Sequence, residues 1–247
     1  MILLRRLLMV CLLGSVGCKS CEESGSTDAD LPDISTSIQF QSVAELGAHR
    51  MTAQIRRKDV RSGEVSLDND ETLVLVWNDA DSFINRVLRD GVIQSEDRVV
   101  DGVPYSRRRA GLWIQKEDAE PMRVSVYTTW NVWENALDLY SDRIAYSEPV
   151  SDIYEGRDAR RYTLSLAASD ARSQRAVRRQ RLDGEPIHLA GQVWLDGERA
   201  VRLKAEVTGM WKKGDLEKTV QLSMARTDLG QTQSVEIPDG IIEKRSP

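Results

Sequence analysis

The feature that most constrains the fold is a two-residue alternation of apolar and polar side chains, which runs through most of the 247-residue chain after Ser37. In residues 201–208, Val, Leu, Ala and Val occupy every second position, and Arg, Lys, Glu and Thr lie between them. Because successive side chains of a β-strand point to opposite faces, this pattern predicts strands with one apolar and one polar face. We predict such strands at residues 37–46, 51–55, 81–91, 122–129, 160–166, 187–197, 198–211 and 218–226.

Turn signals divide these stretches. Residues 63–77 are predicted to form two strands joined by a turn at residues 68–70, where Asp-Asn-Asp separates two apolar stretches. Glycine adopts positive φ angles freely and aspartate tolerates them, so Asp-Gly between alternating stretches is typical of a two-residue hairpin turn. Such pairs occur beside strand-like stretches at residues 90–91, 101–102, 183–184 and 196–197, and again at residues 239–240. The chain is therefore predicted to form an antiparallel meander.

Helical patterns are few. The clearest covers residues 131–149, where apolar residues recur at steps of three and four and Pro149 follows as a stop. Residues 170–181 are short of apolar side chains and are predicted to form either a second helix or a charged loop. No break in composition divides the remainder, so we predict one mainly β (α+β) domain at residues 37–247.

The N-terminus has the composition of a targeting segment. Residues 1–17 contain two arginines, an apolar stretch and a run of small residues. The uncharged run at residues 7–17 is 11 residues long, and a helix needs about 20 residues to cross the hydrocarbon core of a bilayer. We therefore predict a signal peptide at residues 1–17, with uncleaved anchoring as the alternative. Because the small residues lead directly to Cys18, the segment resembles a bacterial lipoprotein signal, whose cysteine is acylated on sulfur and becomes the mature N-terminus.

The pair Cys18 and Cys21 forms a C-x-x-C, which also occurs in redox and metal sites. A redox pair lies between a strand and a helix, whereas residues 19–36 are rich in Ser, Asp, Glu and Gly. A zinc site needs further Cys or His ligands, and the two histidines of the chain are not spaced as a pair. We predict that residues 18–36 are an acylated cysteine followed by a flexible acidic tether, in which Cys21 is a spare thiol. The alternative is that Cys18 only ends the apolar run.

The charge of the chain argues against several partners. Without residues 1–17 it carries 32 basic and 39 acidic residues, a net charge of −7, so nucleic acid is not expected as a partner. The basic clusters at residues 107–109 and 175–181 are interpreted as a solvated face or a loop, with contact to anionic lipid headgroups as the alternative. All three cysteines lie within the first 21 residues, so no disulfide is expected in the body of the protein.

Motifs for catalysis, cofactors and metals are missing from the sequence. It contains no G-x-S-x-G, H-E-x-x-H, P-loop or G-x-G-x-x-G pattern. His49 lies near a predicted strand end and His188 within an alternating strand, and both are interpreted as surface or satisfied positions. No two of the 39 acidic residues stand out as a pair for glycoside hydrolysis. We therefore predict that the protein is not an enzyme and uses neither a cofactor nor a metal.

One stretch points to a family. The pattern G-x-V-W-x-D at residues 191–196 runs into a long alternating strand, and the C-terminal part contains VEIPDG at residues 235–240. Together with the helix at 131–149 and a strand-rich N-terminal half, this resembles the LolA-like superfamily of envelope lipoprotein carriers, anchored receptors and lipid-binding lipoproteins. The resemblance implies a single curved antiparallel sheet that forms an incomplete barrel, with one or two helices plugging its open side.

The same resemblance implies an apolar cavity for acyl chains between the sheet and the helices. Barrel interiors are filled either by side chains or by a ligand, and both give the same alternating sequence. Packing in an ordinary core is therefore the alternative for each residue of this set. The candidate cavity residues are Phe40, Leu75, Trp77, Trp130, Trp133, Leu137, Trp194 and Leu203.

These observations lead to two hypotheses of function. The first is a monomeric, lipid-anchored bacterial envelope protein that binds the acyl chains of a lipid or lipoprotein in a half-barrel cavity. The second is a non-catalytic structural or protein-interaction lipoprotein whose core is filled. Lys19 follows Cys18 where enterobacterial lipoproteins of the inner membrane carry an acidic residue. We therefore expect the anchor to lie in the outer membrane and the body to face the periplasm.

Overall fold

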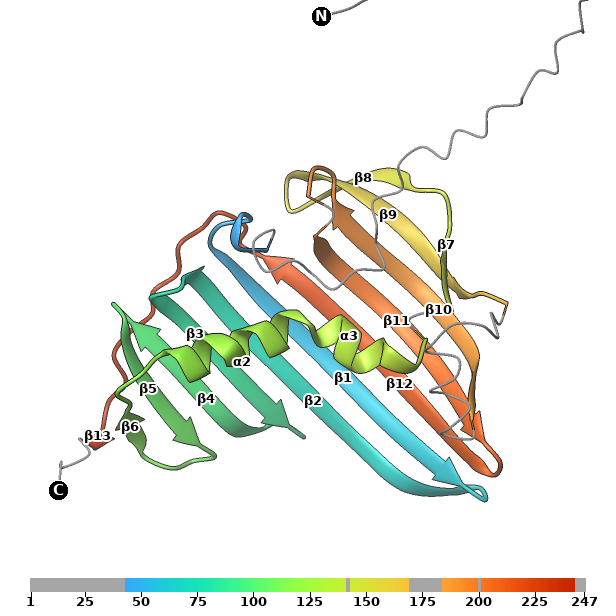
Figure 1. Ribbon diagram of the computed structural model, residues 1–247, viewed down its shortest axis with the longest axis horizontal. Coiled ribbons are helices and arrows are strands. Elements are labelled where there is room, and N and C mark those ends of the chain that lie inside the picture. Colours follow the sequence, from blue (N-terminus) through green and yellow to red (C-terminus); the bar gives the residue numbers. More distant parts are fainter. Residues whose placement is uncertain (1–42, 141–142, 169–183, 200, 243–247) are drawn as a thin grey trace, which may run out of the picture. The chain divides into compact units, whose positions relative to one another are not determined.

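The fold is dominated by one large sheet. The computed structural model describes residues 43–140, 143–168, 184–199 and 201–242, and the statements below concern these residues. Phe40 and Cys18 lie outside them, as do residues 170–181. The sheet is curved and its two edges do not pair, and two short helices lie across one of its faces (Figure 1). This confirms the predicted mainly β class, with a single curved, unclosed antiparallel sheet.

The strands follow one another in the sheet almost as they do in the sequence. Their order across the sheet is β13-β6-β5-β4-β3-β2-β1-β12-β11-β10-β9-β7, and β8 also pairs with β9. All pairs are antiparallel except β13 with β6, which is parallel. The strands are β1 (His49–Arg61), β2 (Glu64–Asp79), β3 (Ser82–Arg89), β4 (Val92–Val100), β5 (Val103–Arg108), β6 (Trp113–Gln115), β7 (Ile144–Tyr146), β8 (Val150–Tyr154), β9 (Arg157–Leu166), β10 (Glu185–Asp196), β11 (Arg202–Lys213), β12 (Leu216–Thr227) and β13 (Ile241–Ile242).

Two of the Asp-Gly pairs turn the chain as predicted. The two-residue turn predicted at residues 196–197 is wrong, because neither residue has a positive φ angle and β11 begins only at Arg202, and Asp183 of a further pair lies outside the described residues. Asp90 and Gly91 join β3 to β4 with φ angles of 50° and 76°, and Asp101 and Gly102 join β4 to β5 with 49° and 80°. Two successive positive φ angles are the geometry of a two-residue turn whose twist matches that of the flanking strands. These turns explain why consecutive strands lie next to each other.

The strand predicted at residues 122–129 is wrong, because this segment is helical. Helix α2 (Glu120–Trp130) has a proline in its first turn, where the missing N–H of proline would have no partner within the helix. Its buried side chains include Met122, Val126 and Trp130, which recur at four-residue steps and face the sheet. Packing of this stripe outweighs the strand preference of the β-branched residues between 122 and 129.

The helix predicted at residues 131–149 is shorter than expected. Helix α3 (Val132–Leu137) continues into the single 3₁₀ turn η1 (Asp138–Tyr140). Residues 144–146 form strand β7 instead, which pairs with β9 from Ile144↔Leu166 to Tyr146↔Leu164. Residues 144–146, which the three- and four-residue spacing predicted to be helical, therefore pair with the free edge of β9 instead.

Two further predictions need correction. β2 passes through residues 68–70 without a turn, because β1 supplies polar partners there: Arg56 donates two hydrogen bonds to Asp68, both at 3.2 Å. Residues 43–46, predicted as the end of a strand, form a helical turn. In it, Leu46 N–H donates to the Val43 carbonyl at 3.1 Å, and both side chains are buried at a three-residue spacing.

Candidate functional site

The candidate site is the face of the sheet that α2 and α3 cover. α2 contacts β2, β3 and β4, and α3 contacts β12 (Figure 1). Because the strands alternate, every second side chain points toward the helices, and most of these side chains are apolar and buried. The helix-covered face, as we call this surface, consists of Met51, Ala53, Leu73, Leu75, Trp77, Val220, Leu222 and Met224.

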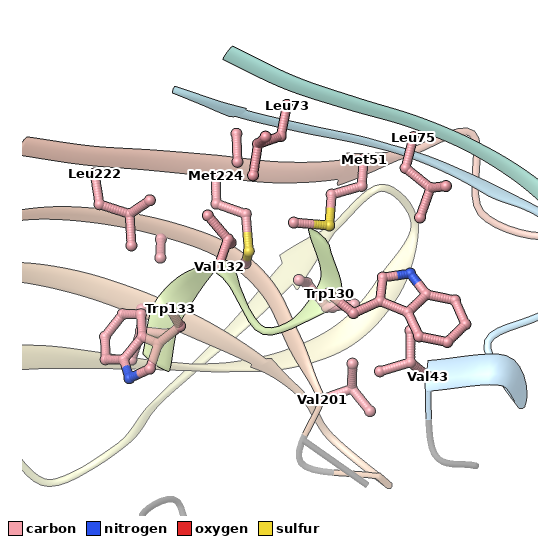
Figure 2. Close-up of a cluster of buried hydrophobic side chains, with 14 of the residues drawn as sticks. Val43, Met51, Leu73, Leu75, Trp130, Val132, Trp133, Val201, Leu222 and Met224 are labelled. Carbon is pink, nitrogen blue, oxygen red and sulfur yellow. The ribbon is translucent and has the colours of Figure 1, made fainter. Parts of the chain in front are cut away.

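Side chains of the two helices complete the apolar cluster. Figure 2 shows Met51, Leu75 and Met224 pointing from their strands toward the segment that carries Trp130 and Val132. The two helices thus present an apolar stripe to the sheet across their junction, although a one-residue break separates them.

Aromatic rings form a ladder at one end of the cluster. Trp77 stacks on Phe83 with ring centroids 5.7 Å apart, and the edge of Trp130 meets Trp77 at 4.8 Å. His49 stacks on Trp130 at 6.2 Å. Aromatic pairs at these separations contribute about 1 kcal/mol beyond the burial of their area, so the ladder fixes where the C-terminal end of α2 rests on the sheet.

Most of the predicted cavity residues come together here. Those that belong to this one cluster, all buried, are Leu75, Trp77, Trp130, Trp133, Leu137 and Leu203. Phe40 lies outside the described residues. The sequence placed these residues in one set on alternation and family resemblance, and the structure brings six of the eight into contact with a common core.

Trp194 lies elsewhere. Its neighbours Val193 and Leu195 are buried toward the helices, so the two-residue period points Trp194 to the opposite face of the sheet. There its indole N–H donates to Asp152 Oδ2 at 3.0 Å, and Lys204 Nζ lies 4.6 Å from the ring centroid. This tryptophan therefore takes no part in the candidate site.

An open cleft adjoins the covered face where α2 begins. Its volume is about 1190 Å³. Met122 belongs both to the cleft wall and to the apolar cluster, so the cleft leads to the covered side chains. The wall is of mixed polarity and is formed by Asp97, Gly102, Val103, Pro104, Ser106, Arg108, Ile114, Gln115, Lys116, Glu117, Asp118, Pro121, Met122 and Ser125.

Three basic side chains are buried against the cluster: His49, Arg202 and Arg226. Arg202 lies over the ring of Trp133, 4.6 Å from its centroid, and its Nη2 is 3.8 Å from Glu134 Oε1. His49 donates from Nδ1 to the Gly47 carbonyl at 2.9 Å. Burial first, and the charge of Arg226 second, lower the pKa of His49 to about 4, so its ring is neutral at neutral pH.

Sequence reasoning missed these buried groups, although a signal was present. His49 precedes Met51, Ala53 and Ile55 at the same two-residue spacing, and Arg226 follows Leu222 and Met224 in the same way. A charged or titratable residue that shares the two-residue spacing of the apolar side chains lies on the same face of the strand and is buried with them. His49 was interpreted as a surface or satisfied position, whereas it is fully buried and its Nε2 has no partner among the described residues.

The opposite face of the sheet carries a separate buried ion cluster. Glu96 accepts hydrogen bonds from Arg86, Arg98 and Arg107, the shortest at 2.6 Å from Arg107 Nη2. The ring of Trp113 lies against the guanidinium groups of Arg98 and Arg107, at 4.8 and 4.7 Å. The buried carboxylate of Glu96 is fully paired by arginines of the protein itself, so we regard this cluster as structural. Arg107, predicted to lie on a solvated face or loop, is part of it.

Neither a family model nor a curated protein sequence matches the chain. Among solved structures it is similar to MucB, with 15% identity and a TM-score of 0.29, over 81% of this chain and 62% of that one. An outer membrane lipoprotein-sorting protein domain from Vibrio parahaemolyticus is 12% identical with a TM-score of 0.23, over 79% of this chain and 92% of that one. A LolA superfamily protein from Nitrosomonas europaea is 10% identical with a TM-score of 0.21, over 81% of this chain and 94% of that one.

The structural neighbours thus include LolA superfamily proteins, the group that the sequence pattern resembles. The chain spans 62% of the length of the MucB structure. Because these TM-scores lie below 0.5, the function proposed below rests on the geometry of this chain.

Two general properties of the described residues complete the picture. Within this part of the chain, every helix is too short or too polar to pass through a bilayer. The same residues contain no group of three or more His, Cys, Asp or Glu side chains that could hold a metal ion.

Proposed function

We propose that this protein binds the acyl chains of a lipid or lipoprotein between the helix-covered face and helices α2 and α3. The observation that carries the proposal is that a continuous apolar face, built from β1, β2 and β12, is covered by two short helices. The role is one of binding and needs no catalytic group.

The helices depend on the sheet for their stability. α2 has 11 residues and α3 has six, and neither has a side-chain hydrogen bond at its N-cap. Isolated helices shorter than about 12 to 15 residues are marginal in water. An acyl chain that takes over the apolar contacts of these helices therefore displaces a cover that has little stability of its own.

Few polar contacts hold α2 in place. The side chain of Asn85 on β3 donates to Ser125 at 3.0 Å and accepts from Thr129 at 2.9 Å. At the start of the helix, Arg123 donates to the Ala80 carbonyl at 3.0 Å and to Asp81 at 2.7 Å. These contacts specify one closed position, and each contributes only about 1 kcal/mol to stability.

The burial of an acyl chain supplies the free energy that offsets the contacts it replaces. Each methylene group that moves from water to an apolar environment gains about 0.8 kcal/mol. A chain of a dozen methylenes therefore gains about 10 kcal/mol on burial, and against this gain stand the polar contacts of α2 and the apolar contacts that the helices give up. The cleft beside Met122 offers a point of entry, because Met122 belongs both to its wall and to the apolar cluster.

We further propose that the protein acts in the bacterial envelope, tethered through acylated Cys18 in the outer membrane and facing the periplasm. The basic, apolar and small-residue order of residues 1–17 supports this anchor. Incorporation of radiolabelled palmitate into the wild type but not into Cys18→Ala tests it directly. Equal labelling of both would reject the anchor.

Tryptophan fluorescence tests the binding proposal. The full chain with Cys18→Ala is titrated with dibromostearate, whose bromine atoms quench only tryptophans that lie close to the bound chain. Trp130→Phe should reduce the quenched fraction, because Trp130 lies in the apolar cluster. Trp194→Phe, on the opposite face of the sheet, is the matched control and should leave the quenched fraction of the remaining emission undiminished.

Native mass spectrometry and lipid extraction of the same protein give an independent measurement. Co-purified lipid, or uptake of added fatty acid, supports the proposal. A protein with no bound lipid, no uptake and no quenching rejects it and favours the alternative, a protein-interaction lipoprotein with a filled core. The near-complete burial of the helix-covered face in the closed position is the observation in favour of that alternative.

A further inference from the structure

Among the described residues, one buried charge next to the helix-covered face, that of Arg226, has no counter-charge. Arg226 stands at the end of β12, opposite Met51 of β1, and is 0% exposed. Its Nη1 donates a short hydrogen bond to the Arg202 carbonyl and lies 3.7 Å from the sulfur of Met224. Its Nε and Nη2 have no hydrogen-bond partner in the described part of the chain.

Such an arrangement is unusual for a guanidinium group. Buried arginines are almost always paired, and a buried polar atom without a partner costs about 1 to 3 kcal/mol. The groups that act electrostatically on Arg226 are Arg202, which repels it, and the hydroxyl of Tyr154, which is weakly favourable. Burial first and Arg202 second lower the pKa of Arg226 to about 9, so the side chain still carries its charge at neutral pH.

The neighbouring groups also leave hydrogen-bonding capacity unused. His49 is charge-coupled to Arg226 and fully buried. Because its Nδ1 is engaged by the Gly47 carbonyl, the free ring position is Nε2, which has no partner among the described residues. Tyr154 is half-buried, so this end of the cluster lies near the surface. The site therefore combines a fixed positive charge, a neutral imidazole and a phenol.

The position of the charge relates it to the acyl-chain site. Met51 lies opposite Arg226 on β1, Met224 precedes it by two residues on β12, and both belong to the helix-covered face. His49, which also lies near Arg226, stacks on Trp130. A molecule that lies along this face therefore has its chain on apolar side chains and one end at the guanidinium. The ligand that matches both parts is an amphiphile with a single anionic group at the end of its chain.

We propose that Arg226 binds the anionic head group, a carboxylate or a phosphate, of a lipid whose chain occupies the helix-covered face. This inference rests on the proposed function. Nε and Nη2 are the two donors of the guanidinium fork, and such a pair binds two oxygens of one carboxylate or phosphate. The bound anion replaces the counter-charge that the protein itself does not supply at this position.

The test compares ligands that share an oleoyl chain and differ in the head group. Oleate, methyl oleate and oleoyl lysophosphatidate are titrated into the full chain with Cys18→Ala at neutral pH, and binding is followed by calorimetry. The wild-type site should bind one of the two anionic ligands at least about tenfold more tightly than methyl oleate, the factor expected for one charge-assisted contact. A preference for oleate identifies a carboxylate ligand, and a preference for the lysophosphatidate identifies a phosphate ligand.

Variants then assign the preference to the residue. Arg226→Met should remove the discrimination while leaving the affinity for methyl oleate within about twofold, and Arg226→Lys should retain part of it. Arg56→Met, which removes an exposed arginine on the other face of the sheet, is the matched control and should change nothing.

The outcomes separate this inference from the function on which it rests. If wild-type protein binds oleate, lysophosphatidate and methyl oleate equally, the anion site is rejected and the acyl-chain site stands. If the preference for an anion survives in Arg226→Met, the assignment to Arg226 is rejected. If none of the three ligands binds, the proposed function itself fails.

Discussion

Replacing Arg226 by methionine should stabilise the ligand-free protein, although the residue is completely buried. The lowering of its pKa from the ordinary value of an arginine to about 9 indicates how much the site disfavours the charged form. At 1.36 kcal/mol for each pKa unit, this corresponds to about 5 kcal/mol at neutral pH. Methionine has a similar length and no charge, and it matches Met224 and Met51 beside it.

Against this gain stands one lost hydrogen bond. Nη1 of Arg226 donates to the Arg202 carbonyl, and a bond from a charged donor contributes about 2 kcal/mol. The net expectation for Arg226→Met is a rise of about 3 kcal/mol in the free energy of unfolding, within the range known for apolar replacement of buried charges.

Urea unfolding of lipid-free protein at pH 7, followed by circular dichroism, measures this difference. Arg56→Met serves as the control, because its side chain is 57% exposed and its removal should change stability by less than about 0.5 kcal/mol. A loss of stability in Arg226→Met would refute the reasoning, since it would mean that the charge is compensated in the free protein.

The pH dependence gives a second check on the same residue. The folded protein releases the proton of Arg226 near pH 9, whereas the unfolded chain holds it to a higher pH, as an ordinary arginine does. The unfolded state therefore binds more protons in the window above pH 9, and stability rises with pH there. The difference in stability between Arg226→Met and wild type should shrink across the same window.

Three further outcomes follow from the structure. Burial alone would raise the pKa of Glu96, but the hydrogen bonds from three arginines outweigh it and lower the pKa to about 2. The stability that Glu96 contributes is thus present above pH 4.5 and is lost as the pH falls to 2, and Glu96→Gln should cost about 3 kcal/mol in thermal or urea unfolding at pH 7. The pKa of His49 is lowered to about 4, and the unfolded chain takes up the proton at a higher pH than the folded protein does. The free energy of unfolding should therefore fall by about 3 kcal/mol as the pH falls from 6.5 to 4. His49→Phe keeps the stacking on Trp130 and should abolish that loss, and an unchanged dependence of stability on acid pH would contradict the assignment to His49. Gly191→Ala should lower the free energy of unfolding by about 3 kcal/mol in urea, because its Cβ would lie 2.2 Å from the backbone oxygen of Glu206 and the backbone would have to shift. A neutral effect would show that β10 and β11 can move apart at this position.

The strands and turns were predictable because their signals are local. Alternation gave residues 51–55, 160–166 and 218–226 correctly, since one face of each strand is buried and the other is solvated. The Asp-Gly pair at 90–91 gave its hairpin because the turn needs positive φ at both positions. Neither signal depends on contacts far away in the sequence.

The helices and the charged site depend on such distant contacts. Residues 122–129 have β-branched side chains at alternate positions and become helical only because the sheet offers an apolar face on which Val126 and Trp130 pack. Residues 68–70 remain in a strand because they pair with residues 56–58 of β1, where Lys58 lies opposite Asp68 and Arg56 lies opposite Asp70. Likewise, nothing in the sequence around Arg226 shows that no carboxylate approaches it, since this depends on which residues the fold brings near.

The order of the strands has a consequence for how this chain folds during synthesis. Strands β1 to β6 are joined by short turns and contact neighbours in the sequence, but β1 also pairs along most of its length with β12, from Arg50↔Thr227 to Arg61↔Leu216. Pairings between distant segments form slowly, because a long loop must first be closed. Until β12 has left the ribosome, one edge of β1 has no partner, and the apolar side chains of β1 are only partly buried. The nascent N-terminal half is therefore open to association with other chains, and export through a membrane before folding would separate it from them.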